Sequence, residues 1–412
     1  MVNHMTRKRT ALLCAAALLL TSTPLLAGTA ASADAVGSAR RGSDCVASPA
    51  PARGQARVIQ DTVEKARRDL KLRAVVARVT ENGRELWTGA LGTSMTGVPA
   101  RPDMRFRAGS VAITYMGTIL LQLADEKRIS LDDPLSRWLP EVPHAREITL
   151  RMLGDTTSGF QDYVKNPDFQ KALLAQPFKQ WTPEELLGYA NPRTLLYRPG
   201  TNLSYSHANF LLLGEALQRI THTRLDHLLE QRIYRPLGLH ATSNGYTPDI
   251  PTPVLHAFTT ARGTYEESTF WNPSWTTAPG AVITQDICDL ARSGEGIGTG
   301  RTLTRQGYRT LFDPGTIGLG EKTAQCPLCI PQTRAAHFGM SVLWVNGWLI
   351  QNPSFLGYAA IMAYLPSRHL SIAVSATDTP NTSTDVTNLA TNVAEAVSQR
   401  LVPGNPLTLG PF

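Results

Sequence analysis

The first part of the chain shows a helical apolar pattern followed by two strand patterns. Apolar residues between Val58 and Leu70 recur at helical spacing and predict a helix. The β-branched run Ala74–Val79 predicts a strand, and residues 85–90 return as a second strand. Between these strands, residues 81–84 contain an Asn-Gly pair, which is typical of a tight hairpin turn. We therefore expect a helix and then an antiparallel hairpin.

Longer apolar helices are predicted in the middle of the chain. In the segment Val111–Lys127, apolar side chains lie three and four residues apart and share one helix face. Residues 147–253 contain short helical stretches separated by Pro and Gly turns, and within them Phe210–Ile220 is a second strongly apolar helix. This part of the chain is therefore expected to form a helical subdomain.

Strand patterns return near the C-terminus. Residues 340–350 predict a hairpin around Asn346-Gly347, and residues 358–364 and 370–375 predict two further strands. Residues 385–401 then predict a closing amphipathic helix. Because strands occupy both ends and helices the middle, we expect an α/β fold. It would consist of an antiparallel sheet flanked by helices, with an inserted all-helical subdomain.

The N-terminus has the pattern of a secretory signal peptide. The basic residues Arg7–Arg9 precede the apolar run Ala11–Leu20, and Ala31-Ser-Ala33 supplies a cleavage site of small residues. The apolar run is about half of the roughly 20 residues that a membrane-spanning helix needs. We therefore expect a signal peptide at residues 1–33, no membrane anchor, and a secreted, extracellular protein.

Composition indicates a globular protein that does not bind nucleic acid. The chain has 412 residues, of which 42% are hydrophobic and 18% are charged. Its net charge of +7 includes three positive charges that the signal peptide would remove, leaving +4. We expect a flexible leader at residues 34–54, a main domain at 55–402 with its helical subdomain at about 147–253, and a C-terminal tail at 403–412.

Four cysteines follow the predicted signal peptide, an even number that suits disulfides in an exported protein. Cys326 and Cys329 have CxxC spacing, which favours a local bridge over a zinc site with His337 as an added ligand. Cys45 and Cys288 are the other possible pair, and the sequence leaves the connectivity open. No metal or cofactor is expected, because the chain lacks GxxxxGK[ST] and HExxH motifs.

A series of motifs points to a known family. The motifs are Arg105–Ser110 ahead of an apolar helix, Leu131–Pro140, Thr157–Gly159, Pro199–Gly214 and Pro279–Thr284. Their order and spacing resemble those of the serine β-lactamases and D-alanyl-D-alanine carboxypeptidases, and the likeness extends over most of the chain. The resemblance implies a β-lactamase-like fold, with Ser110 at a helix N-terminus in a cleft beside the helical subdomain.

The catalytic motifs that the resemblance implies are altered. The family's chemistry needs a serine and a lysine one helical turn apart, so that the amine accepts the hydroxyl proton. Here Ile113 stands at the lysine position after Ser110, and isoleucine accepts no proton. The family's Tyr-x-Asn motif is Tyr205-Ser206-His207, and its His- or Lys-x-Gly triplet is Gln351-Asn352-Pro353. All three motifs thus depart from the family pattern.

Two functional hypotheses from different classes follow. In the first, His207 replaces the lysine as the base for Ser110, Tyr205 assists as acid, base or hydrogen-bond partner, and the enzyme acts on an acyl or amide group. Asn209 or Asp155 would orient His207. In the second, the protein is a non-catalytic pseudoenzyme that binds a cell-wall peptide or a similar ligand, and Ser110 is kept as a helix N-cap. A conventional D-alanyl-D-alanine carboxypeptidase is a third, less favoured alternative.

The hypotheses share one expectation about the ligand. It would be a small molecule or a peptide bound in the cleft, without a cofactor. Gln351, Asn352 and Ser354 are the residues expected to bind it, since they lie on the strand that lines the cleft in the family.

Overall fold

The computed structural model describes residues 45–382 and 388–410. The predicted signal peptide and residues 34–44 of the predicted leader lie outside these ranges. The rest of the leader contacts the sheet, because Cys45 is buried and the Ser48 amide donates to the Thr88 carbonyl at 2.8 Å. No helix in the described part of the chain is both long and apolar enough to cross a bilayer.

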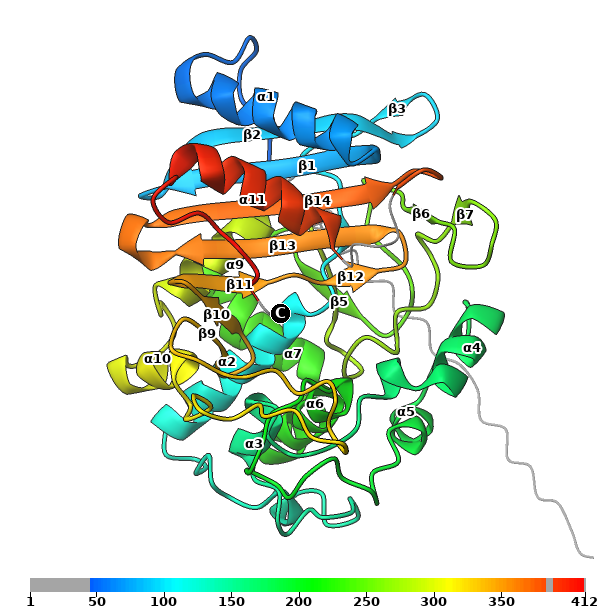
Figure 1. Ribbon diagram of the computed structural model, residues 1–412, viewed down its shortest axis with the longest axis vertical. Helices are drawn as coiled ribbons and strands as arrows, with labels where there is room; N and C mark the ends of the chain where they lie inside the picture. The colour runs from blue at the N-terminus through cyan, green and yellow to red at the C-terminus, as the bar shows by residue number, and fades with distance from the viewer. Residues whose placement is uncertain (1–44, 383–387, 411–412) are drawn as a thin grey trace, which may run out of the picture. The chain divides into compact units, whose positions relative to one another are not determined.

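A nine-stranded antiparallel sheet is built from both ends of the described chain, as the sequence predicts (Figure 1). In spatial order, the strands are β3 (Val98–Pro99), β2 (Arg84–Met95), β1 (Leu72–Glu81), β14 (Leu370–Asp378), β13 (Tyr358–Leu365), β11 (Trp348–Gln351), β10 (Leu343–Val345) and β9 (Ala336–Phe338), with β12 (Ser354–Phe355) also paired to β13. Strand β1 pairs directly with β14, which brings residues separated by almost 300 positions side by side.

Both predicted Asn-Gly hairpin turns are confirmed. Asn82 and Gly83 have φ values of 52° and 72°, and Asn346 and Gly347 have values of 49° and 84°. Two consecutive residues with positive φ form the type I′ turn, whose twist matches that of the flanking strands. These turns fix the register of β1 against β2 and of β10 against β11.

Helices cover both faces of the sheet. Helices α1 (Gly54–Asp69) and α11 (Leu389–Leu401) lie on one face and α9 (Ile287–Gly298) lies on the other (Figure 1). As a result every residue of β13 is buried, which explains its nearly continuous apolar sequence. The closing helix begins at Leu389, later than the predicted start at residue 385, because Asn388 caps it by accepting from the Thr391 amide. Residues 385–387 lie outside the described ranges.

The middle of the chain is largely helical and lies beside the sheet. Its helices are α2 (Val111–Asp125), α3 (Leu150–Gly154), α4 (Pro167–Ala175), α5 (Pro183–Tyr189), α6 (His207–Thr221), α7 (Leu225–Leu229), α8 (Arg235–Leu237) and α10 (Arg305–Phe312), with the 3₁₀ turns η1 (Leu135–Arg137) and η2 (Tyr163–Lys165) and the π-helical segment η3 (Glu230–Tyr234). A further 3₁₀ turn, η4 (Pro366–Arg368), connects β13 to β14. Five short strands complete the fold: β4 (Phe106–Arg107), β5 (Ser243–Gly245), β6 (Phe258–Thr259), β7 (Glu266–Glu267) and β8 (Val282–Gln285). Strand β5 lies within the predicted helical range and pairs with β8, so that range is not entirely helical.

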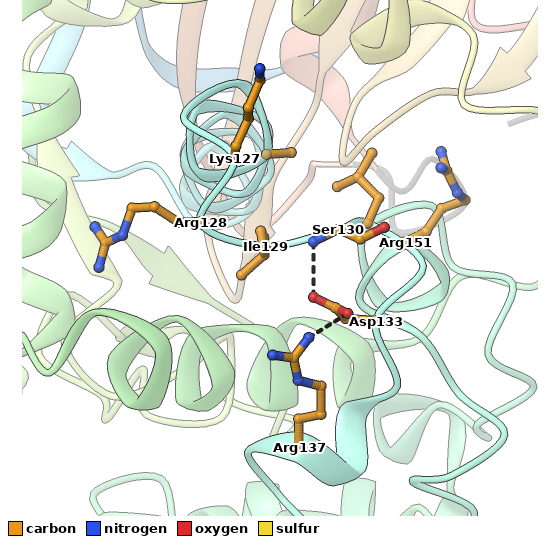
Figure 2. A pocket seen from close by; sticks show the side chains of 9 residues that line it. Lys127, Arg128, Ile129, Ser130, Asp133, Arg137 and Arg151 are labelled. Carbon is orange, nitrogen blue, oxygen red and sulfur yellow. Dashed lines mark hydrogen bonds and ion pairs between the residues drawn. The ribbon is translucent and has the colours of Figure 1, made fainter.

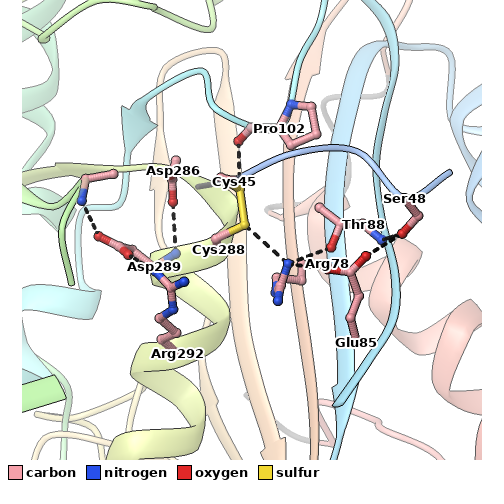
Figure 3. Close-up of a disulfide and its surroundings, with 11 residues drawn as sticks. Cys45, Ser48, Arg78, Glu85, Thr88, Pro102, Asp286, Cys288, Asp289 and Arg292 are labelled. Atoms are coloured by element: carbon pink, nitrogen blue, oxygen red, sulfur yellow. Dashed lines mark hydrogen bonds and ion pairs between the residues drawn. A yellow bond between two sulfur atoms is a disulfide. The ribbon is translucent and has the colours of Figure 1, made fainter. Parts of the chain in front are cut away.

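Two disulfides join the four cysteines. Cys326 and Cys329 form the predicted local bridge, and Cys45 pairs with Cys288 at the start of α9. Figure 3 shows Arg78 donating to the sulfur of Cys288 at 3.4 Å beside this second bridge. The bridge closes a loop of 243 residues and joins the N-terminal segment to the first turn of α9. In the usual chain-entropy account, loops of this length give a disulfide a large stabilising effect.

Candidate active site

Ser110 lies at the N-terminal end of α2, as expected, but it does not act as a capping residue. Its backbone has helical dihedral angles, with φ of −64° and ψ of −5°, and its side chain makes no capping hydrogen bond to the helix. The serine is partly exposed, and its hydroxyl lies close enough to the Tyr205 hydroxyl to lower the pKa of that phenol. The structure therefore gives no support to a purely capping role for this serine.

Tyr205 holds a neutral phenol next to Ser110. Burial of the hydroxyl raises the pKa of Tyr205, the negative charge of Asp162 raises it further, and the hydrogen bond with Ser110 lowers it by less. Because this pKa lies well above its ordinary value, the phenol stays protonated at neutral pH. Tyr205 is thus suited to donating a hydrogen bond rather than to acting as a phenolate base.

His207 is the first residue of α6 and is held by Asp162. Its Nδ1 lies 3.0 Å from Oδ1 of Asp162, and its backbone amide donates to the same oxygen at 3.2 Å. An Nδ1–H that donates to a carboxylate leaves Nε2 as the nitrogen with a free lone pair. The edge of the imidazole contacts the Tyr205 ring at 5.1 Å between centroids, and Trp275 lies 6.3 Å away.

The pKa of the Asp162 carboxyl is lowered in spite of its burial. Burial raises the pKa of Asp162, but the positive charge of His207 and hydrogen bonds from that residue and from the Val164 amide outweigh this effect and lower the pKa overall. A buried carboxylate that is ionised and accepts from an imidazole is the arrangement that orients the histidine in serine hydrolase triads.

The predicted orienting partners of His207 are therefore wrong. Asn209 accepts from the Ser158 hydroxyl at 2.5 Å, and Asp155 accepts from the Thr157 hydroxyl at 2.6 Å. The first contact joins the loop after α3 to α6, and the second lies within that loop. Among the described residues no hydrogen bond joins His207 to Ser110, and Tyr205 is the residue that lies near both side chains.

The segment that follows β11 approaches the residue before Ser110. A Cβ placed on Gly109 would lie 2.9 Å from Cβ of Pro353, so the proline packs against Gly109. Gly109 has a φ of 40°, which glycine adopts without strain. The residue next to Ser110 therefore has no room for a side chain on the side that faces Pro353.

The three predicted binding residues have different environments. Gln351 is buried, and its amide donates to the Ser341 carbonyl at 2.8 Å, the same oxygen that accepts from Thr114 on α2. Asn352 is partly exposed and Ser354 is exposed. Asn388, which the sequence analysis did not single out, donates to the backbone oxygens of Asn352 and Pro353 at 2.8 and 2.9 Å. Gln351 is therefore a structural contact, while Asn352 and Ser354 remain accessible.

Ile113, which stands where the resemblance implies a lysine, is a buried apolar residue. Its side chain is 1% exposed and belongs to the apolar core around α2. An apolar side chain there neither accepts the Ser110 proton nor donates to Tyr205.

Within residues 45–382 and 388–410, potential metal ligands come together at one place, which does not include Ser110. Cys45, Asp286 and Cys288 have ligand atoms within 4.8 Å of one another, but the two sulfur atoms are joined in a disulfide and are not available as thiolates.

Asp155 is a buried acid at the C-terminal end of α3. Burial raises the pKa of Asp155 to about 7, although hydrogen bonds from Thr157 and the charge of Arg151 act in the opposite direction. Since this pKa exceeds the ordinary value of 3.8, the folded protein holds a proton that the unfolded chain releases between those pH values. Asp155 therefore lowers the free energy of unfolding as the pH rises from about 4 to 7.

Replacing Asp155 by Asn is expected to remove this pH dependence. The variant should gain on the order of 2–4 kcal/mol over the wild type at pH 8, and much less at pH 4, because asparagine still accepts from Thr157 without a charge to bury. Urea unfolding at both pH values measures the difference. Asp168→Asn, at an exposed position on α4, is the control and should show no such change. An equal gain for Asp155→Asn at pH 4 and pH 8 would contradict the assignment.

Curated relatives match part of the chain. The D-alanyl-D-alanine-carboxypeptidase/endopeptidase AmpH of Escherichia coli is 28% identical over 181 residues, which is 42% of this chain and 46% of that protein. Penicillin-binding protein 4 of Amycolatopsis lactamdurans is 31% identical over 162 residues, which is 38% of this chain and 40% of that protein. The matched region thus spans less than half the length of these relatives.

Solved structures match most of the chain. A D-stereospecific amidohydrolase from Streptomyces sp. superposes with a TM-score of 0.68 at 24% identity, covering 85% of this chain and 99% of that one. The D-amino acid amidase from Ochrobactrum anthropi SV3 gives a TM-score of 0.70 at 19% identity, covering 84% and 99%. At these identities the likeness shows the fold. The family model described as Beta-lactamase matches residues 59–397, nearly all of the described chain. The chain therefore belongs to the beta-lactamase family.

Proposed function

We propose that this protein is an exported serine enzyme that acts on an acyl or amide group with a histidine in place of the family's lysine. Ser110 attacks the carbonyl carbon and passes its proton to the Tyr205 hydroxyl, which passes its own proton to Nε2 of His207. The histidine then gives a proton to the leaving amine or alcohol as its bond to the carbonyl carbon breaks, and Asp162 keeps His207 in the tautomer that accepts at Nε2. Export rests on the signal-peptide pattern at residues 1–33.

The observation that carries this proposal is the row of adjacent side chains from Asp162 to Ser110. Asp162 binds Nδ1 of His207 at 3.0 Å, His207 contacts the ring of Tyr205, and the Tyr205 hydroxyl interacts with Ser110. Isoleucine at position 113 coincides with a histidine at position 207 and a buried carboxylate behind it. A dead pocket would not need a buried carboxylate held against an imidazole at this place, because such buried pairs contribute little to stability on balance.

The matched proteins support the acyl or amide class. Their printed names include two amidohydrolases and EstCE1, described as a hydrolase with promiscuous acyltransferase activity, which superposes with a TM-score of 0.66. All of these names describe chemistry at a carbonyl carbon. The identity of the substrate is left open by this proposal.

A non-catalytic binding protein is the second candidate, and Pro353 favours it. The proline stands where the family has a glycine, packs against Gly109, and has no N–H to offer a ligand. In this case the exposed groups of Asn352 and Ser354 would hold a peptide or small ligand without any reaction.

Covalent labelling distinguishes the two candidates. A fluorophosphonate probe should add once to the wild-type protein, and intact-mass measurement should show no adduct on Ser110→Ala. His207→Ala should slow labelling by about 10²–10⁴-fold, which is the usual range for a general base. His337→Ala is a control, because that buried histidine lies between two backbone carbonyls away from Ser110. Absence of any adduct on the wild type between pH 5 and about 9 would favour the binding protein.

A further inference from the structure

A shallow cavity lies at the end of helix α2 that is farthest from Ser110. It has a volume of about 610 Å³ and is lined by Ala124, Lys127, Arg128, Ile129, Ser130, Leu131, Asp133, Arg137 and Arg151. A smaller cavity of about 370 Å³ shares three of these residues. Because α2 has 15 residues, the two ends of the helix are about 22 Å apart. The cavity is therefore separate from the candidate active site.

Basic side chains outnumber acidic ones around this cavity. Figure 2 shows Lys127, Arg128, Arg137 and Arg151 placed around the turn that follows α2, with Asp133 between Ser130 and Arg137. Within residues 45–382 and 388–410, the Lys127 ammonium group has no hydrogen-bond or ion-pair partner. The nearest carboxylate to Arg128 is Glu126 at 3.9 Å, and Arg232 already holds both oxygens of Glu126 at 2.6 and 3.1 Å.

The two other arginines keep donors available. Arg137 pairs with Asp133 at 2.5 Å, and Arg151 pairs with Asp132 at 2.8 Å. A guanidinium carries five N–H donors, and a single carboxylate uses at most two of them. Asp133 also accepts from the Ser130 amide at 2.8 Å. This acid therefore stabilises the turn in addition to pairing with Arg137.

Lys127 occupies a backbone position that does not suit lysine. The Arg128 amide donates to the Leu123 carbonyl and the Lys127 amide to the Ala124 carbonyl, which together form a Schellman motif at the end of α2. The residue in the middle of that motif adopts a left-handed conformation, here with a φ of 58°, and is usually glycine. Glycine at position 127 would adopt this conformation with less backbone strain. Attraction to the helix dipole does not require Lys127, because Arg128 already supplies a cation one residue later.

We propose that this cavity is a binding site for a phosphate group. Two cations without a firm partner, two arginines with spare donors and the Ser130 hydroxyl surround an open space of suitable size. Arginine forks match the spacing of phosphate oxygens, and a dianion gains more than a single carboxylate from several nearby cations. Apolar side chains of Ala124, Ile129 and Leu131 line the cavity beside these groups. They suit a phosphate ester that also has a carbon skeleton.

The phosphate could come from a small phosphomonoester or from a phosphodiester polymer, and the test separates these sources. Isothermal titration at low salt would use glucose 6-phosphate in one arm and poly(glycerol phosphate) in the other. We expect saturable binding in at least one arm, weakening as ionic strength rises. The double variant Lys127→Gly/Arg128→Ala should bind about 10-fold more weakly or worse. The single variant Lys127→Gly should also melt at a higher temperature than the wild type, because glycine relieves the backbone.

Two controls separate this site from other causes. Lys171→Ala removes an exposed cation on α4 and should leave binding unchanged. Ser110→Ala should also bind normally, since the cavity does not depend on the serine or on the proposed reaction. The proposal is overturned if neither ligand binds the wild type saturably, if the double variant binds as tightly as the wild type, or if Lys171→Ala weakens binding to the same degree.

Discussion

Replacement of Asp162 by Asn is expected to slow the acylation of Ser110 by about 10²–10⁴-fold, equivalent to roughly 3–5 kcal/mol in activation free energy. The carboxylate accepts from Nδ1 of His207 at 3.0 Å and so leaves Nε2 free to act as a base. An asparagine can present its NH₂ group to the ring instead, which favours the opposite tautomer. It also removes the negative charge that stabilises the imidazolium formed when the proton is taken up.

The second-order rate of fluorophosphonate labelling measures this effect without a known substrate. A structural role alone would not change the tautomer, so a second measurement is the NMR signal of the His207 Nδ1 proton. This signal should be visible in the wild type and lost or moved in Asp162→Asn. Asp155→Asn is the matched control, because that acid is also buried but binds Thr157 and not the histidine. Equal labelling rates for Asp162→Asn and the wild type would rule out an orienting role for Asp162.

The general architecture follows from local sequence patterns. Two Asn-Gly pairs predict the hairpins at Asn82 and Asn346, because few other residues tolerate two successive positive φ values. Long apolar periodicity predicts α2 and α6, which are buried along most of their lengths. Such features depend on neighbours in the chain, and they were correct to within a few residues.

Contacts between segments far apart in the chain could not be predicted from local sequence patterns. Asp162 lies 45 residues before His207, and its sequence context resembles that of any acid at the start of a helical turn. Indeed it also accepts from the Val164 amide at 3.1 Å, which is the ordinary capping role. The choice between Asn209, Asp155 and Asp162 as the partner of His207 depends on how the loop after α3 packs against α6. Periodicity carries no information about that packing.

The orientation of the Gln351 side chain could not be predicted from the sequence either. On a strand buried on both faces, alternation does not tell which side a polar residue occupies. The Ser341 carbonyl, brought near by the β9–β10 connection, takes the amide of Gln351 and so draws it away from solvent. Strand β11 therefore reaches the site with a buried amide followed by Asn352 and Pro353.

Restoring the family's motifs is the second large effect that we expect. In the triple variant Ile113→Lys/His207→Asn/Pro353→Gly, the new amine lies one turn from Ser110, the new asparagine gives it a hydrogen-bond partner, and the glycine opens the space beside Gly109. Acylation by a β-lactam should then rise from none to a stoichiometric adduct. The single variant Ile113→Lys should gain little, because position 113 is buried and an unpaired ammonium there favours its neutral form.

Intact mass after incubation with a penicillin measures the adduct, and Ser110→Ala in the triple background should abolish it. The single variant Ile113→Lys should lose about 1–3 kcal/mol in the free energy of unfolding, and His207→Asn should recover part of that loss by satisfying the amine. Ile113→Met is the matched control for a long side chain without charge, and it should neither acylate nor lose as much stability. If the triple variant folds as well as the wild type and still forms no adduct, the altered motifs are not what prevents β-lactam chemistry. Changes at other positions around Ser110 would then prevent acylation by a β-lactam. The family's lysine and asparagine could no longer take over the role proposed for His207 and Asp162.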